Sequence, residues 1–193
     1  WAHHALAHVM LKQGRIEEGR VFMAEMSTTW ENLVSFMYTH NWWHTALFDI
    51  ARGDNTEALA IFDRHCWGLE NDYSQDQIGA VSLLLRLELV GCDVGERWQT
   101  VADYLMARVD DHVQPFLTMQ YLYGLARAGR QEAAVIECTC VSDIQMPALD
   151  DADGGQLMVD ILAGAKALEH LELCPPQPAP PPRAAPLRFA PVQ

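Results

Sequence analysis

Histidines spaced four residues apart occur twice near the start of the chain. His4 and His8 form one pair, and His40 and His44 form the other. Residues four apart share one face of an α-helix, so each pair would direct two imidazole rings to the same side. Imidazole is a ligand for zinc, copper, iron and nickel. The spacing therefore allows a metal site with up to four histidine ligands, provided that the two helices lie side by side.

The two histidine pairs do not match a known catalytic motif. Ala5 follows His4 where a zincin has its glutamate base, and neither pair contains an acidic residue, which disfavours a carboxylate-bridged di-iron site. Alternatively, the histidines pack between helices and hydrogen-bond to the backbone or to Asn41, as helix histidines mostly do. Both interpretations stay open. No catalytic residue is assigned, no cofactor is predicted, and a non-enzymatic role is favoured.

Other chemical motifs are weaker. The Cys138-Thr139-Cys140 string is too short and isolated for a zinc site. Asp150, Asp151 and Asp153 lack the glycine position and terminal glutamate of a calcium loop, which favours a solvated turn. A phosphate-binding glycine loop and a nucleophile elbow are also missing from the sequence. The histidine pairs are therefore the main candidate for chemistry.

Composition narrows the class of protein. The 193 residues carry a net charge of −13, which argues against nucleic acid and anionic membranes as partners and mildly favours basic proteins. Five scattered cysteines indicate a reducing, cytoplasmic setting rather than a disulfide framework. The longest uncharged run, 32–48, is too polar to span a bilayer.

Glycines at a near-constant period indicate how the histidines are positioned. Gly14, Gly53, Gly91 and Gly129 lie 39, 38 and 38 residues apart, and each would end one helix where the next begins. Asp54 and Glu57 have the spacing of a capping box. The period predicts an all-α fold, an α-solenoid of antiparallel, tetratricopeptide-like helix pairs. The first helices of the pairs are predicted at 2–13, 40–52, 76–90 and 115–128, and the second at 16–26, 55–66, 95–109 and 131–140.

The chain divides into two parts by composition. A helical repeat domain is predicted over 1–172, with one further helix near 156–171 after a loop. Eight of the ten prolines lie between Pro175 and Pro191, so 173–193 is expected to be a disordered tail, with an SH3-type ligand as the less favoured alternative. Trp1 has no capping residue before it, which suggests a fragment of a longer chain.

Several strings resemble one family, the tetratricopeptide repeat protein 38 family. The resemblance covers roughly residues 1–135 and implies a soluble, intracellular α-solenoid with no activity that carries over. Gln120 stands where members of the family often have a histidine. The strings that carry the resemblance are His4-Ala5-Leu6-Ala7-His8-Val9, Gln13-Gly14-Arg15, His40-Asn41-Trp42-Trp43-His44-Thr45-Ala46-Leu47, Gly53-Asp54, Phe62-Asp63-Arg64-His65 and Gly91-Cys92-Asp93-Val94-Gly95-Glu96-Arg97-Trp98.

The first helices of the pairs are expected to line a concave face. Counting thirteen, ten and six residues back from each turn glycine gives the inward positions, which are Trp1, His4, His8, His40, Trp43, Leu47, Ile78, Val81, Leu85, Phe116, Met119 and Tyr123. The favoured function is a scaffold that binds a protein or peptide through this face. The predicted binding residues are Trp1, His4, His8, His40, Trp43, His44, Phe116 and Tyr123. The apolar half of the stripe would be exposed in an open solenoid, so we expect it to be covered in the native protein, by flanking repeats in preference to a second copy of the chain or the segment after Gly155. The fragment alone is then expected to self-associate.

The alternative function uses the first two helix pairs alone. His4, His8, His40 and His44 would then bind a metal or act as acid–base groups on a small molecule, with Trp43 as one wall. The two functions predict different losses on mutation. Partner binding should depend on Trp43, whereas metal binding should depend on the histidines.

Overall fold

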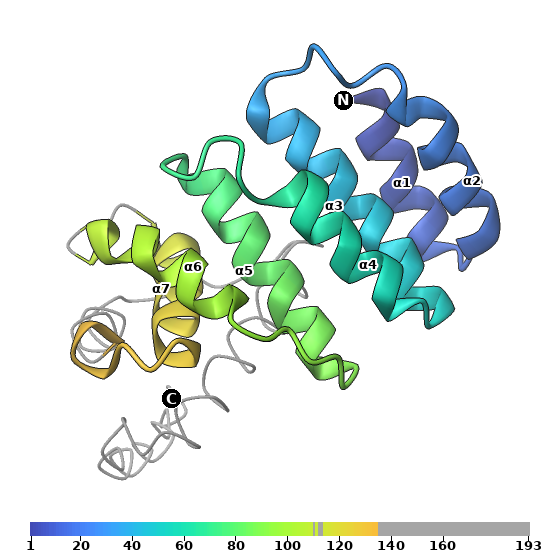
Figure 1. The fold of residues 1–193 in the computed structure, drawn as a ribbon. Coiled ribbons are helices and arrows are strands. Elements are labelled where there is room, and N and C mark those ends of the chain that lie inside the picture. Colours follow the sequence, from blue (N-terminus) through green and yellow to red (C-terminus); the bar gives the residue numbers. More distant parts are fainter. Residues whose placement is uncertain (110, 112–113, 135–193) are drawn as a thin grey trace, which may run out of the picture.

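The structure is a computed structural model that describes residues 1–109, 111 and 114–134. Throughout this part the chain is helical, without a strand, which confirms the all-α prediction (Figure 1). Residues 131–134 begin a further helical segment. The predicted helix 156–171 and the tail 173–193 lie outside the described residues. The α-helices are α1 (Ala2–Lys12), α2 (Ile16–Ser27), α3 (Ser35–Arg52), α4 (Asn55–Ile61), α5 (Ser74–Leu89), α6 (Arg97–Leu105) and α7 (Pro115–Arg127).

Glycines in the left-handed backbone conformation end four of the helices, as the sequence predicted. Gly14, Gly53, Gly91 and Gly129 have φ angles of 68°, 80°, 80° and 71°, a region that residues with a side chain rarely adopt. The next helix begins within a few residues of Gly14 and Gly53. Asp54 caps α4, because its carboxylate accepts a hydrogen bond from the backbone N–H of Glu57 at 3.2 Å. These short turns reverse the chain direction.

Successive helices pack as neighbours. α1 contacts α2, α3 contacts α4, and α5 contacts α6. The first helix of each pair also contacts the first helix of the next, so α1, α3, α5 and α7 lie side by side in series (Figure 1). Side chains from four distant segments of the sequence can therefore line one surface.

Large aromatic side chains anchor these helices. Trp30 is completely buried and packs edge-on against Trp42 of α3, while its Nε1 donates a hydrogen bond to His3 Nδ1 at 3.2 Å. Trp98 of α6 is also buried and contacts Tyr123 of α7 edge-on. Burial of an aromatic ring stabilises a fold by roughly 1.5–3 kcal/mol.

Two helix boundaries differ from the prediction. α3 begins at Ser35, five residues before the predicted start, because the hydroxyls of Ser35 and Thr39 donate hydrogen bonds to the buried carboxylate of Asp76 on α5. The predicted second helix 55–66 is α-helical only to Ile61 and continues as a π-helical turn over Phe62–Cys66. A 3-10 turn over Met106–Arg108 similarly extends α6.

In the part of the chain that the structure describes, none of the helices combines the length and apolar character that a bilayer span requires.

Candidate functional site

The four predicted histidines meet between α1 and α3. The ring of His4 lies 4.6 Å from that of His8, 4.8 Å from that of His40 and 4.9 Å from that of His44, measured between centroids. The rings of His8 and His44 are 4.5 Å apart. Each pair shares one helix face, and contact between α1 and α3 places the two pairs against each other. The condition that the sequence left open, that the two helices lie side by side, is met for these four rings.

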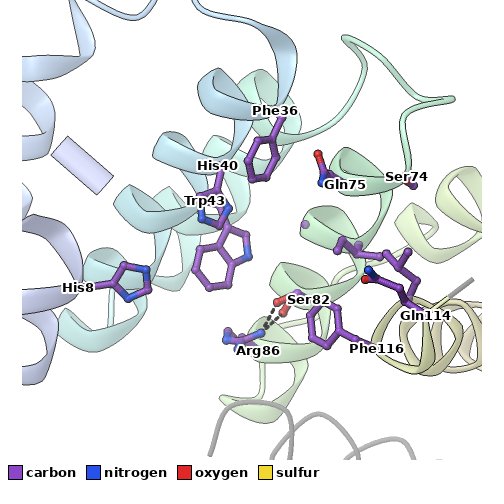
Figure 2. Close-up of a pocket in the computed structure, with 13 residues that line it drawn as sticks. His8, Phe36, His40, Trp43, Ser74, Gln75, Ser82, Arg86, Gln114 and Phe116 are labelled. Atoms are coloured by element: carbon purple, nitrogen blue, oxygen red, sulfur yellow. Dashed lines mark hydrogen bonds between the residues drawn. The ribbon is translucent and has the colours of Figure 1, made fainter. Parts of the chain in front are cut away.

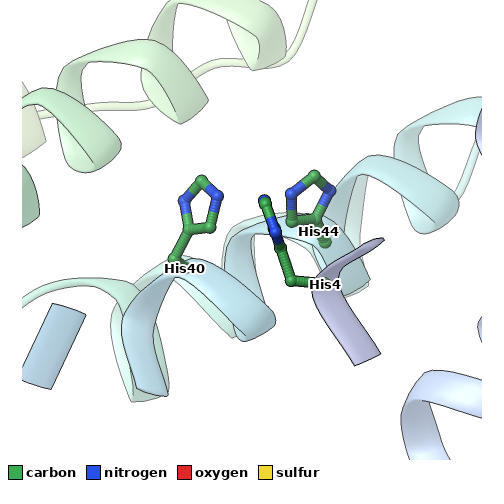
Figure 3. Close-up of side chains that lie close together, drawn as sticks. All are labelled: His4, His40 and His44. Atoms are coloured by element: carbon green, nitrogen blue, oxygen red, sulfur yellow. The ribbon is translucent and has the colours of Figure 1, made fainter. Parts of the chain in front are cut away.

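Three of these imidazoles form a compact set of nitrogen donors. One ring nitrogen from each of His4, His40 and His44 lies within 4.8 Å of the other two (Figure 3). His8 stands beside this set, with its Nε2 3.0 Å from His4 Nε2 in a hydrogen bond. One nitrogen of that bond donates a hydrogen and the other accepts it, so the accepting ring must be neutral.

His44 is the most unusual member of the cluster. It is completely buried, and neither Nδ1 nor Nε2 has a hydrogen-bond partner among the described residues. The amide oxygen of Asn41 is also buried without a partner in this part of the chain, so Asn41 does not serve His44 through that atom. Buried polar atoms are nearly always paired, and an unpaired one costs about 1–3 kcal/mol. The purely structural interpretation, in which these histidines hydrogen-bond to Asn41 or the backbone, therefore does not account for His44.

Burial keeps the cluster uncharged. Burial, together with repulsion from the neighbouring His4 and His8, lowers the pKa of His40 to about 4. The pKa of His44 falls well below its usual value for the same reason, with added repulsion from the other histidines and from Arg86. The pKa of His4 is lowered in the same direction. These lowered pKa values favour the neutral form of His4, His40 and His44 at pH 7, which is the form that binds metals.

A cavity of about 520 Å³ adjoins the histidines. His8 and His40 form one end of it, and Trp43 lies next to them (Figure 2). The remaining walls come from Phe36 of α3, from α5 and α7, and from the residue that precedes α7. These described lining residues are Phe36, Ser74, Gln75, Ile78, Gly79, Ser82, Arg86, Gln114, Phe116 and Leu117.

Stacked rings form the α3 wall of the cavity. The Phe36 ring stacks on His40 with centroids 5.1 Å apart, and the His40 ring lies nearly parallel to the Trp43 indole at 5.5 Å. The guanidinium carbon of Arg86 on α5 lies 5.1 Å from the centre of the Trp43 ring. This cation–π contact connects α3 to α5. The stacking places His40 both in the histidine cluster and in the wall of the cavity.

The positions counted back from the turn glycines fall into two groups in the structure. His8, His40, Trp43, Ile78 and Phe116 do line the common cavity. Four other counted positions, Val81, Leu85, Met119 and Tyr123, are buried in the core instead.

Close packing of α5 against α7 explains these core positions. A Cβ atom on Gly124 of α7 would lie 3.1 Å from Val81 Cγ2 and 2.5 Å from Leu105 Cδ1, so Gly124 lets α7 approach α5 and α6 closely. The apolar stripe at Val81 and Tyr123 is therefore covered by the fold itself. The expectation of self-association loses its structural reason.

Trp1 lies at the edge of the site. Its side chain is 76% exposed, contacts the His4 ring edge-on at 5.7 Å and is not among the lining residues of the cavity. Phe36 and Arg86 were missed by sequence reasoning. Phe36 falls before the predicted start of its helix, and Arg86 does not occupy a counted position. The hydrogen bonds of Asp76 that extend α3 to Phe36 are tertiary contacts, so only a three-dimensional structure could locate it.

One further histidine, His65, packs against a different face of α3. His65 stacks on Trp42 with a centroid separation of 3.8 Å and an interplanar angle of 7°, and its Nδ1 is 2.7 Å from Tyr38 Oη. Cys66 beside it is a free, buried thiol whose pKa is raised by burial. These contacts give His65 a structural explanation that His44 lacks.

Comparison with known proteins adds no further assignment. The chain matches no protein-family model and no solved structure.

Proposed function

We propose that His4, His40 and His44 bind a divalent transition metal beside a small-molecule cavity, with zinc as the best-fitting ion. The observation that carries the proposal is His44, whose two buried ring nitrogens have no hydrogen-bond partner among the described residues and lie next to two other neutral imidazoles. A metal bond would satisfy one of these nitrogens. Neutral imidazole is a preferred zinc ligand.

The geometry requires only a small adjustment. Nitrogens of a tetrahedral zinc site lie about 3.3 Å apart, because each bond is about 2.0–2.1 Å long. The nitrogens of the three histidines are separated by up to 4.8 Å, and rotation of the imidazole rings can reduce this distance. Three protein ligands leave one tetrahedral position for water or substrate, as catalytic zinc sites do. Such an ion would supply a Lewis acid and an activated water next to the cavity.

His8 has a separate role in this proposal. It hydrogen-bonds to His4 and also lines the cavity. Partners of this kind orient metal-bound imidazoles, and losing one typically weakens metal binding by 10- to 100-fold. We therefore place His8 as a positioning residue that could become the fourth ligand.

The test is a zinc titration of protein purified without a histidine tag. Calorimetry should give one high-affinity zinc per chain, and His44→Gln should weaken binding by at least about 100-fold, since it removes a direct ligand. His65→Gln is the matched control, because His65 is a part-buried helical histidine outside the cluster. Substoichiometric metal, together with a melting temperature unchanged by chelator, would reject the metal site.

A second candidate is the tetratricopeptide-like interaction scaffold favoured by the sequence and by the resemblance of residues 1–135. It is supported by the series of paired helices and by the aromatic side chains of Phe36, Trp43 and Phe116 around one cavity. Phe116 is 37% exposed, so it could contact an inserted partner side chain. The charge of −13 favours a basic partner, and free Cys66 and Cys92 are consistent with a reducing, cytoplasmic location.

One substitution separates the two candidates. Trp43→Ala removes an aromatic anchor but no metal ligand. If the cavity serves a protein partner, the variant should lose capture of that partner in a pull-down while zinc binding is retained. Undiminished capture by the variant would remove the cavity from partner binding.

A further inference from the structure

Gly79 is a feature of the cavity wall that packing does not explain. It lies inside α5, where glycine destabilises a helix relative to alanine, and its φ angle is not positive. A Cβ atom at Gly79 would meet nothing within 4 Å, whereas one on Gly19 or Gly124 would overlap a neighbouring side chain. The missing side chain instead leaves open space in the wall of the cavity. Glycine at such a place lets a ligand approach the backbone closely.

Flat rings stand on both sides of Gly79. On α3, the His40 ring lies within 6° of parallel to the Trp43 indole and within 28° of parallel to Phe36. On α7, Phe116 lies across the cavity from Trp43 and is 37% exposed (Figure 2). Because α5 contacts both of these helices, its surface at Gly79 forms a floor between two aromatic walls. A flat aromatic molecule could lie on this floor at the centroid separations of about 4.5–7 Å that aromatic pairs prefer.

Trp43 offers one polar group to such a ligand. Its Nε1–H is buried and has no hydrogen-bond partner among the described residues, and Figure 2 shows this nitrogen on the side of the ring that faces the cavity. An indole nitrogen can only donate, and buried donors are nearly always paired. An acceptor atom on a bound molecule would pair with it after a small rotation of the indole. The unpaired donor therefore favours a ligand that carries an acceptor.

We propose that the cavity binds a flat aromatic molecule with a hydrogen-bond acceptor, which lies over Gly79 and accepts a hydrogen bond from Trp43. The proposal rests on the proposed function in that it names the ligand class of the cavity beside the histidines. The volume of about 520 Å³ falls within the usual range for small-molecule pockets, about 300–1,000 Å³, and Ile78 and Leu117 add aliphatic surface. Stacking and one neutral hydrogen bond hold the ligand, so it needs no net charge.

Matched probes test the two parts of this ligand class. The ketone 2-acetylnaphthalene is flat and carries an acceptor, whereas the alkene 2-isopropenylnaphthalene has nearly the same shape and no acceptor oxygen. A third probe, 2-acetyldecalin, carries the same carbonyl on a saturated, puckered body. Calorimetry in the presence of chelator, which keeps metal from binding the carbonyl, should show 2-acetylnaphthalene binding most tightly. Its failure to bind, or equal affinity for all three probes, would overturn the proposal.

Substitutions at Gly79 test where the ligand lies. Gly79→Ala and Gly79→Leu extend progressively into the space over α5, so affinity for 2-acetylnaphthalene should fall stepwise. We expect Gly79→Leu to weaken binding by about 10-fold or more, because overpacking usually costs a free energy comparable to a tenfold change in affinity. Gly79→Ala guards against a folding defect, since alanine favours the helix. Ala24→Leu is the matched control, because Ala24 is an exposed residue of α2 that does not line the cavity. Unchanged affinity in Gly79→Leu would place the ligand elsewhere.

Trp43→Phe tests the hydrogen bond. The substitution removes the Nε1 donor and keeps an aromatic ring on α3. Affinity for the ketone should fall by about 3- to 10-fold relative to affinity for the alkene, the usual effect of losing one neutral hydrogen bond. The ratio of the two affinities cancels the effect of the smaller ring, which both probes share. An unchanged ratio would contradict the role of Trp43 as donor.

The two proposals fail in different ways. One zinc per chain without selective probe binding would reject the ligand class and leave the metal site. Selective binding of 2-acetylnaphthalene that depends on Gly79, in a protein that takes up no zinc, would support the ligand class and reject the metal site.

Discussion

Gly19 of α2 and Phe48 of α3 lie so close together that a Cβ atom on Gly19 would be 2.2 Å from Phe48 Cε1. Phe48 is completely buried, so its ring cannot move into solvent. We expect Gly19→Ala to lower the free energy of unfolding by about 1–3 kcal/mol, the usual cost of overpacking a core. Urea unfolding followed by circular dichroism measures this change.

Gly79→Ala provides the control for that experiment. Gly79 is also a helical glycine, but a Cβ atom there would meet nothing within 4 Å. Alanine should therefore raise the free energy of unfolding by roughly 0.5–1 kcal/mol through its better helix propensity. If both variants were equally stabilised, the contact between Gly19 and Phe48 would not be tight.

Acid should destabilise the metal-free protein through the histidine cluster. The pKa of His40 is about 4 in the folded chain, against 6.5 when unfolded. Between these values the unfolded state binds more protons, so the free energy of unfolding falls as pH decreases from about 6.5 to about 4. The loss from His40 alone is on the order of 3 kcal/mol, and His44 adds to it in the same direction.

Urea unfolding at several pH values between 4 and 7 measures this dependence. His40→Gln should flatten part of the slope, because glutamine does not titrate. An unchanged slope in that variant would show that His40 titrates normally in the folded protein.

The ion pair between Arg20 and Asp49 should be important for stability. Arg20 Nε lies 2.7 Å from Asp49 Oδ1, and the Asp49 side chain is 1% exposed. Arg20→Met would leave this carboxylate with only the longer contact to Arg52, at 3.6 Å. We expect a loss of about 2–4 kcal/mol, in line with other broken buried pairs. Thermal melting at pH 7 measures it.

The pH dependence of Arg20→Met offers an internal check. Burial already raises the pKa of Asp49, and Arg20 opposes that rise, so removing Arg20 should raise the pKa further. The folded variant then binds more protons than the unfolded one, and its deficit should shrink as pH falls. Arg15→Met, which breaks an exposed pair with Glu18, should change stability little. A large loss in Arg15→Met would contradict the importance of burial.

Zinc should stabilise the folded chain if the three histidines bind it. Free zinc at 100 times the dissociation constant raises the free energy of unfolding by about 2.7 kcal/mol, which corresponds to a melting temperature several degrees higher. The effect should disappear in His44→Gln and with excess chelator. A similar rise in His44→Gln would place the binding site elsewhere.

Local patterns account for the parts of this protein that could be predicted from sequence. The turns at Gly53 and Gly129 depend on glycine's access to positive φ, and the pairing of His40 with His44 depends only on helix geometry. Each of these patterns involves residues that lie within a few positions of one another in the sequence. The helix periods and the shared face of each histidine pair therefore follow from the amino-acid sequence alone, whereas the meeting of the two pairs depends on contact between α1 and α3.

Tertiary contacts determine the rest. The start of α3 depends on Asp76, which lies 41 residues beyond Ser35 in the chain. The place of Val81 in the core depends on Gly124, which lets α7 approach more closely than a uniform period implies. Arg86 comes to the cavity because α5 packs on α3, and a residue count from the glycine turns cannot detect this contact. Such relationships leave no mark on the neighbouring sequence.

The π-helical turn at Phe62–Cys66 has a consequence for how this protein can change in evolution. A π turn accommodates one residue more than an α turn, so it is the trace that a single-residue insertion leaves in a helix. Removing one residue would rotate everything after it by about 100° around the helix axis. His65 would then leave the face of Trp42, and Cys66 would leave the backbone of Thr39. Relatives of this chain should therefore retain the extra residue wherever they retain this histidine–tryptophan stack.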